Sequence, residues 1–188
     1  MTEGFKSKEI ILQAQKKILG KVTNKNVVKL FIDERNASIL DNLYRLAKIY
    51  TGNKKESEKL TKNIIKIIVK LSILSRNDQF DNNELKLAHN FKDVFREIIM
   101  ITISFYEIEF SYNKNYLTSY LFKCKEILKD LTKKHLTDKT LTRIDKIFEF
   151  FSNPLFLDTV FIKQESQLIV DTVKILIDGL KELLDKDL

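Results

Sequence analysis

The chain has 188 residues, of which 44% are hydrophobic and 31% are charged, and this balance is typical of a folded globular protein. Only four glycines and one proline interrupt it, so we expect long helices and few forced turns. The formal net charge is +7, but Asp and Glu are spread along the chain, which argues against a dedicated basic face and predicts no nucleic-acid partner.

The residues that carry catalysis in other proteins do not form a recognisable set. Cys124 is the single cysteine, so an internal disulfide is excluded and a reducing, intracellular setting is expected. His89 and His135 have no metal-ligand spacing with each other or with Cys124, and we expect both to be structural. There is no P-loop and no GxSxG motif. We therefore expect a protein that is not an enzyme and that needs no metal or cofactor.

No part of the sequence predicts a membrane span or a signal peptide. No apolar stretch reaches the roughly 18 residues that a spanning helix needs. The most hydrophobic run, residues 98–105, is preceded directly by Glu97 and followed shortly by Glu107. Any membrane contact is therefore expected to be peripheral.

The first predicted helix covers residues 8–19 and combines an apolar stripe with lysines at its edges. A helical projection gathers on one side the residues Ile11, Ala14, Ile18, Leu19 and Val22. Lys16 flanks this stripe on one edge, and Lys17 and Lys21 flank it on the other. Such a pattern is typical of a helix that lies in a membrane interface. It also fits an ordinary amphipathic helix packed on its own domain, and the sequence does not decide between the two.

Three further helices are predicted in the first half of the chain. A short one covers residues 24–32. Asn36 is a plausible N-cap for a second that runs to Tyr50 and is ended by Gly52. Asn53 and Glu56 form the pattern of a capping box for a third that runs to about residue 75.

The second half of the chain predicts more helices and no strand. Asp81 and Glu84 form another capping-box pattern, which starts a helix with apolar residues spaced from Leu85 to Phe105. Further helices are expected over residues 114–135, from Thr137 or Asp138 to residue 151, and over residues 165–185. Pro154 is expected to break the chain between the last two. The fold class is all-α, a single bundle of six or seven helices.

Several long segments resemble one protein family. They are QAQKKILGKV (13–22), LDNLYRLAKIYTGNKKESEK (40–59), IKIIVKLSILSRNDQF (65–80), HLTDKTLTRIDKIFEFFS (135–152) and DGLKELLD (178–185). In order and spacing they resemble the TIPE family, the relatives of tumour-necrosis-factor-alpha-induced protein eight. The likeness covers nearly the whole chain and is weaker between Pro154 and Gln167.

The resemblance implies a helical domain around a large hydrophobic cavity that holds phospholipid tails. It divides the chain into a mobile, basic N-terminal helix (1–22) and a lipid-binding domain (23–188). Residues expected to line the cavity are Leu43, Ile64, Ile68, Leu71, Phe91, Phe95, Ile98, Leu121, Ile127, Leu128, Phe148, Val173, Ile177 and Leu180.

The resemblance also implies a basic mouth for a phosphoinositide headgroup. Matching the family's basic positions gives Lys16, Lys17, Lys21, Arg76, Lys92 and Lys181. A headgroup with several negative charges needs several cations from different elements, which is the chemistry these residues offer. For Arg76 a structural role is also open, as a partner for the free carbonyls at a helix end.

The expected function is phospholipid and phosphoinositide binding, with lipid transfer, in the regulation of phosphoinositide signalling, cell death, immunity or migration. The expected partners are phospholipids, an anionic membrane surface and signalling proteins. The expected location is the cytoplasm, with peripheral association at the inner face of the plasma membrane. A non-enzymatic adaptor that recruits signalling proteins through its outer surface is the competing hypothesis.

Overall fold

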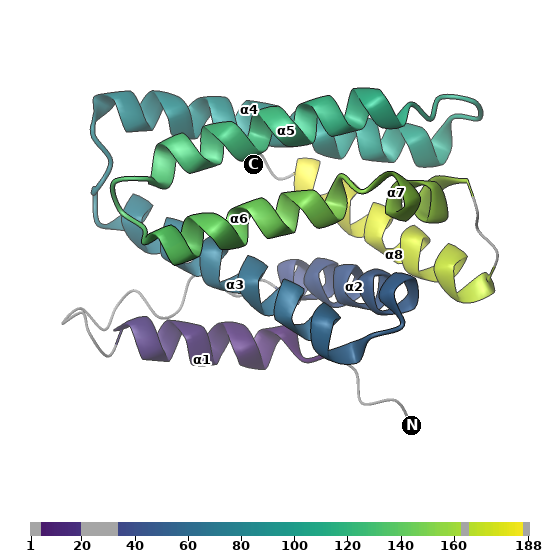
Figure 1. Ribbon diagram of the computed structural model, residues 1–188, viewed down its shortest axis with the longest axis horizontal. Coiled ribbons are helices and arrows are strands. Elements are labelled where there is room, and N and C mark those ends of the chain that lie inside the picture. Colours follow the sequence, from purple (N-terminus) through teal and green to yellow (C-terminus); the bar gives the residue numbers. More distant parts are fainter. Residues whose placement is uncertain (1–4, 20–33, 163–165, 186–188) are drawn as a thin grey trace. The chain divides into compact units, whose positions relative to one another are not determined.

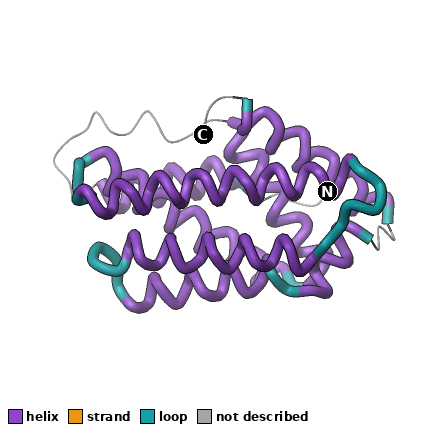
Figure 2. The backbone as a smooth tube through the Cα atoms, turned by 90° about the horizontal axis from the view of Figure 1, so that it is seen from above, coloured by secondary structure: helices purple, strands orange, loops and turns teal. Residues whose placement is uncertain are grey.

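The computed structural model describes residues 5–19, 34–162 and 166–185, and within these ranges the chain forms eight helices and no strand. Figure 2 shows the described backbone as helices joined by loops. The helices are α1 (Ser7–Leu19), α2 (Glu34–Thr51), α3 (Lys54–Arg76), α4 (Asn82–Glu107), α5 (Lys114–Thr132), α6 (Asp138–Phe151), α7 (Pro154–Phe161) and α8 (Gln167–Leu184). The predicted all-α class is confirmed.

The chain folds as two compact units, Met1–Gln79 and Phe80–Leu188. In the first unit α3 packs against both α1 and α2, and α1 also contacts α2 (Figure 1). In the second unit α4 and α5 form the most extensive pair. There α6 packs on α5, α8 packs on α4, and the short α7 contacts α5 and α6.

The first unit is held together by the apolar face of α1. Ile11 is 5% exposed and lies in one cluster with Leu40, Ile65 and Val69. The Phe5 ring stacks on Tyr44 with 4.5 Å between ring centroids. The Ser7 amide donates a hydrogen bond of 3.0 Å to Asp41 Oδ1. Ile11 and Ala14, the members of the predicted stripe whose side chains the structure describes, therefore pack on the chain's own helices.

Helix boundaries follow local capping in most places. Gly52 has φ +63°, a left-handed conformation in which glycine is unstrained, and it ends α2 as predicted. Asn53 Oδ1 accepts a hydrogen bond from the Glu56 amide at 3.2 Å and starts α3. The capping box of Asp81 and Glu84 is complete. Local side-chain chemistry alone was enough to predict these three boundaries.

One local prediction was wrong and another was incomplete. Because α2 begins at Glu34, Asn36 lies inside the first turn and does not cap the helix. The chain does break before Pro154, since α6 ends at Phe151, but Pro154 is also the first residue of a further helix, α7. Proline lacks the N–H group that would be unpaired at a first helical position, and its φ suits the helix. Asn153 Oδ1 then accepts from the amides of Leu155 and Phe156 at 2.9 and 3.3 Å. This helix explains why there are more helices than the predicted six or seven.

Some predictions fall outside the described residues. The short helix over 24–32, the residues Lys21 and Val22, and the proposed boundary between residues 22 and 23 all lie in the segment 20–33.

The buried position of Ile11 predicts that Ile11→Ala releases α1 from the first unit. Loss of a buried isoleucine side chain destabilises a packed site by about 2–5 kcal/mol. Since α1 is a terminal helix with its own small contact area, we expect the loss to appear as faster amide hydrogen exchange along residues 7–14. The exposed Gln13→Ala is the matched control, and equal exchange in the two variants would contradict the packing.

Candidate functional site

Lys16 and Lys17 lie on α1, but their side chains are outside those that the structure describes. At 100° per residue, positions 16 and 17 are about 140° and 120° away from position 11, in opposite directions. Ile10 and Ala14 also pack against this cluster, and position 17 lies only about 20° from position 10. Helix geometry therefore does not place both basic positions opposite the packed face.

A shallow pocket of about 200 Å³ lies beside α1 in the first unit. Its lining includes the aromatic pair Phe5 and Tyr44, together with Ile10, Gln13, Lys6, Lys54, Lys62, Glu9 and Glu58. Glu58 pairs with Lys62 at 3.1 Å and with Lys54 at 4.0 Å, and Glu9 pairs with Lys6 at 3.2 Å. The carboxylates offset most of the lysine charge, and the volume is below the roughly 300 Å³ at which ordinary ligand sites begin. We do not assign the headgroup or the tails to this pocket.

The predicted cavity residues divide into packed and open positions. In the second unit six of them are buried, namely Ile98, Leu121, Ile127, Leu128, Val173 and Ile177. Half-buried positions are Leu43, Ile64 and Leu71 in the first unit and Phe91, Phe148 and Leu180 in the second. Ile68 is 46% exposed and Phe95 is 37% exposed. Only the last two have much free surface beside them, and the cavity itself stays a prediction.

The structure places the three remaining basic candidates on separate elements. Arg76 is exposed at the end of α3 in the first unit. The Ile73 carbonyl there accepts from the Asn77 backbone and side chain, at 3.1 and 2.7 Å, so Asn77 contributes to the cap at this helix end.

Lys92 and Lys181 both belong to the second unit, but the structure does not bring them together. Lys181 on α8 forms an ion pair with Glu107, the last residue of α4, and this pair raises the pKa of Lys181. Lys92 is exposed on the same α4, fifteen residues before Glu107, a separation of about 22 Å along the helix axis. One headgroup cannot bridge both lysines, so their shared role as ligands of a single headgroup stays without structural support.

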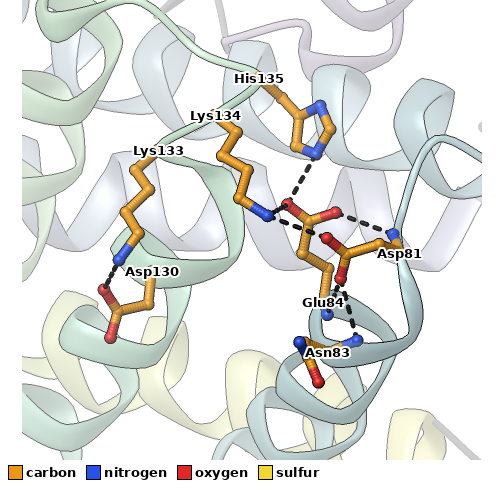
Figure 3. A network of polar contacts seen from close by, with 7 residues as sticks. All are labelled: Asp81, Asn83, Glu84, Asp130, Lys133, Lys134 and His135. Atoms are coloured by element: carbon orange, nitrogen blue, oxygen red, sulfur yellow. Dashed lines mark hydrogen bonds and ion pairs between the residues drawn. The ribbon is translucent and has the colours of Figure 1, made fainter.

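A buried carboxylate network that the sequence reasoning missed lies where α4 begins (Figure 3). Glu84 is 3% exposed, and its Oε2 accepts from the Asp81 amide at 2.8 Å. Its Oε1 lies 3.1 Å from His135 Nε2 and 3.3 Å from Lys134 Nζ. An ionised carboxylate only accepts, so His135 Nε2 carries the shared proton. Lys134 also reaches Asp81 Oδ2 at 2.9 Å.

This network ties the first turn of α4 to the residues after α5, and it has the features of a structural clamp. The Asp81 amide, followed by His135 and Lys134, lowers the pKa of Glu84. Lys134 is the main cause of the lowered pKa of Asp81. The capping-box pattern pointed to Asp81 and Glu84, but no local signal connected them to residues some fifty positions later. His135 is thereby in the structural role that was expected for it.

Three further features of the described residues bear on catalysis or on a membrane span: the reactivity of the cysteine thiol, groups of possible metal ligands, and helices that could span a membrane. Burial raises the pKa of the Cys124 thiol to about 12, so its reactive thiolate is scarce near neutral pH. Within residues 5–19, 34–162 and 166–185, no group of His, Cys, Asp and Glu side chains could hold a metal ion. None of the helices described there is both long and apolar enough to cross a bilayer.

Comparison with known proteins identifies the chain's relatives. A family model described as "Tumor necrosis factor alpha-induced protein 8-like" matches residues 5–187. The chain belongs to this family. The resemblance to the TIPE family noted from the quoted segments is thereby confirmed.

Individual relatives match over most of their length. A "Tumor necrosis factor alpha-induced protein 8-like protein" of Drosophila pseudoobscura pseudoobscura is 49% identical over 157 residues, which is 84% of each chain. The Xenopus laevis "Tumor necrosis factor alpha-induced protein 8-like protein 2" is 42% identical over 185 residues, 98% of each chain. The human "Tumor necrosis factor alpha-induced protein 8" is 38% identical over 186 residues, covering 99% of this chain and 93% of the relative.

The clamp predicts a pH-dependent contribution of Glu84 to stability. Its pKa is lowered in the folded state, so the stabilisation is present above the ordinary value of 4.5 and is lost as pH falls through the lower folded value. We expect Glu84→Gln to lower the denaturant midpoint at pH 7 and to cause a smaller deficit at pH 3. Glu149→Gln, at an exposed site, is the control. An equal deficit at both pH values would show that charge is not the cause.

Proposed function

We propose that the chain is a phospholipid-binding and lipid-transfer protein that takes acyl chains into its helical interior and holds phosphoinositide phosphates on lysine and arginine side chains. Membership of the TIPE family supports the proposal at the level of the family. The structural observation that carries it is the free apolar surface of Ile68 and Phe95, two of the predicted cavity residues.

The energetics of tail binding favour such sites. Each methylene removed from water contributes about 0.8 kcal/mol, so an acyl chain supplies its binding free energy without any covalent step. Ile68 projects from the middle of α3, and Phe95 stacks on Phe91 along α4 at 5.9 Å between centroids. These side chains offer apolar contact without requiring the rearrangement of a packed core.

The first step of the proposed membrane docking is electrostatic attraction between lysine side chains and an anionic lipid surface. Lys16 and Lys17 of α1 are the cations that we propose to meet the lipid phosphates in this first step. Each lysine near an anionic surface contributes about 1 kcal/mol. Insertion of the apolar stripe has an additional free-energy cost, because Ile11 must first lose its contacts with Leu40, Ile65 and Val69. Docking and insertion are therefore successive steps, regulated separately.

The charge-driven step predicts a large effect of Lys16→Glu/Lys17→Glu on binding to vesicles that contain phosphoinositide. Removing two contacts of about 1 kcal/mol each corresponds to about 25-fold weaker binding, and reversal of charge adds to this. Co-sedimentation at physiological salt measures the change. The double variant Lys139→Glu/Lys146→Glu carries the same net charge change on exposed positions of α6. Equal losses in both double variants would indicate only general electrostatic attraction.

The tail-binding step predicts that Ile68→Asn/Phe95→Asn lowers the amount of co-purified lipid. Both positions are partly open, so we expect only a modest loss of folding stability beside the loss of ligand. Native mass spectrometry and uptake of a fluorescent phospholipid measure the ligand. Leu155→Asn, at a site 62% exposed and outside the predicted cavity set, is the control. Unchanged lipid content in the double variant would exclude both residues from tail binding. A parent protein free of lipid would favour the adaptor hypothesis.

A further inference from the structure

The loop between α4 and α5 presents apolar side chains to solvent at its tip. Phe110 is fully exposed at 100%, and Ile108 is 58% exposed. Phe110 also has φ +61°, in the left-handed region that bulky residues rarely occupy. An exposed phenylalanine in a strained backbone loses the benefit of burial and adds a conformational cost. Strained residues of this kind persist where the surrounding structure holds them and tend to gather at functional sites.

The loop is firmly anchored to the second unit. Ser111 Oγ donates to the Ser104 carbonyl at 2.9 Å, and the Tyr112 hydroxyl donates to Asp158 Oδ1 at 2.9 Å. The Tyr112 ring contacts Phe161 at 5.3 Å, which places the end of α7 beside the loop (Figure 1). Burial, followed by Asp158, raises the pKa of Tyr112, so the hydroxyl stays a donor across the physiological range. The contacts of Ser111 and Tyr112 therefore hold the backbone at the tip of the loop in a fixed position.

Charges at the base of the loop are nearly balanced. Lys114 Nζ lies 2.9 Å from Asp158 Oδ2, and Lys181 is paired with Glu107, the residue just before Ile108. Glu109, exposed between the two apolar residues, adds one negative charge. The two apolar side chains at the tip thus flank one exposed carboxylate, and the ammonium groups at the base of the loop are held in ion pairs.

We propose that Ile108 and Phe110 insert into the interfacial region of a phospholipid bilayer and form a second membrane contact, distinct from the basic segment of α1. The proposal rests on the function proposed above for the identity of the surface, because Lys181 is one of its headgroup residues and lies at the base of this loop. The fully exposed ring projects outward and is not set in a groove, so it suits a soft, continuous apolar layer. Since the local charge is not positive, this contact depends on the hydrocarbon layer of the bilayer and does not require anionic lipid.

The sequence permits a clean test because it contains no tryptophan. Phe110→Trp in the full chain makes the tip the only source of tryptophan fluorescence. We expect its emission to shift to shorter wavelength on addition of vesicles of phosphatidylcholine alone, and to be quenched when the acyl chains are brominated. The matched control is Phe122→Trp, at a phenylalanine on α5 that is 60% exposed and has Lys125 Nζ 4.6 Å from its ring centroid. We expect no shift and no quenching at position 122.

A second measurement separates this contact from the α1 contact. On the same neutral vesicles, Phe110→Ser should bind about 10-fold more weakly than the parent, the loss expected for an unburied phenylalanine, while Phe122→Ser binds as the parent does. Absence of shift and quenching at position 110, with parental binding to phosphoinositide vesicles, would overturn the insertion and leave the proposed function intact. Equal quenching at positions 110 and 122 would overturn it in favour of non-specific adsorption. If residue 110 inserts into vesicles but the protein takes up no lipid, the result would support membrane insertion of the loop and contradict the proposed lipid-transfer function.

Discussion

Ile11 can bury its side chain in only one place at a time, and the behaviour of the N-terminal helix depends on this constraint. In the structure it packs with Leu40, Ile65 and Val69, supported by the Phe5–Tyr44 stack and the Ser7–Asp41 hydrogen bond. Release of α1 from the first unit would therefore require contacts that compensate for the packing lost by Ile11.

The second unit meets a related conflict between packing and exposure. Its core is dense around residues such as Val173 and Ile177, each 1% exposed. Phe95 and Phe110 nevertheless keep much or all of their surface in water. In both cases the neighbouring backbone is well anchored, by the long α4 helix or by the contacts of Tyr112 with Asp158 and Phe161. Fixed apolar surface of this kind binds a ligand without first having to be ordered, which lowers the entropic cost of association.

Charge in this chain supports structure as much as it supports binding. Glu84 shows the structural use, since three donors surround a carboxylate that is almost completely buried. Lys181 is held in an ion pair with Glu107. An exposed ion pair of this type contributes little to stability. A count of cations in the sequence does not distinguish these uses, and only the partner of each group does.

The sequence by itself determined the all-α class and the helix ends at Gly52, Asn53 and Asp81, because helical periodicity and capping depend on residues a few positions apart. It also carried the family assignment, through segments that span most of the chain. Tertiary structure decided where each apolar face is buried, that Pro154 starts a helix, and that Glu84 meets His135. It also decided that Lys92 and Lys181 lie far apart and that Phe110 stays in solvent. These outcomes depend on which distant segments pack together, and a one-dimensional pattern records what a side chain is suited to contact without recording which partner it finds.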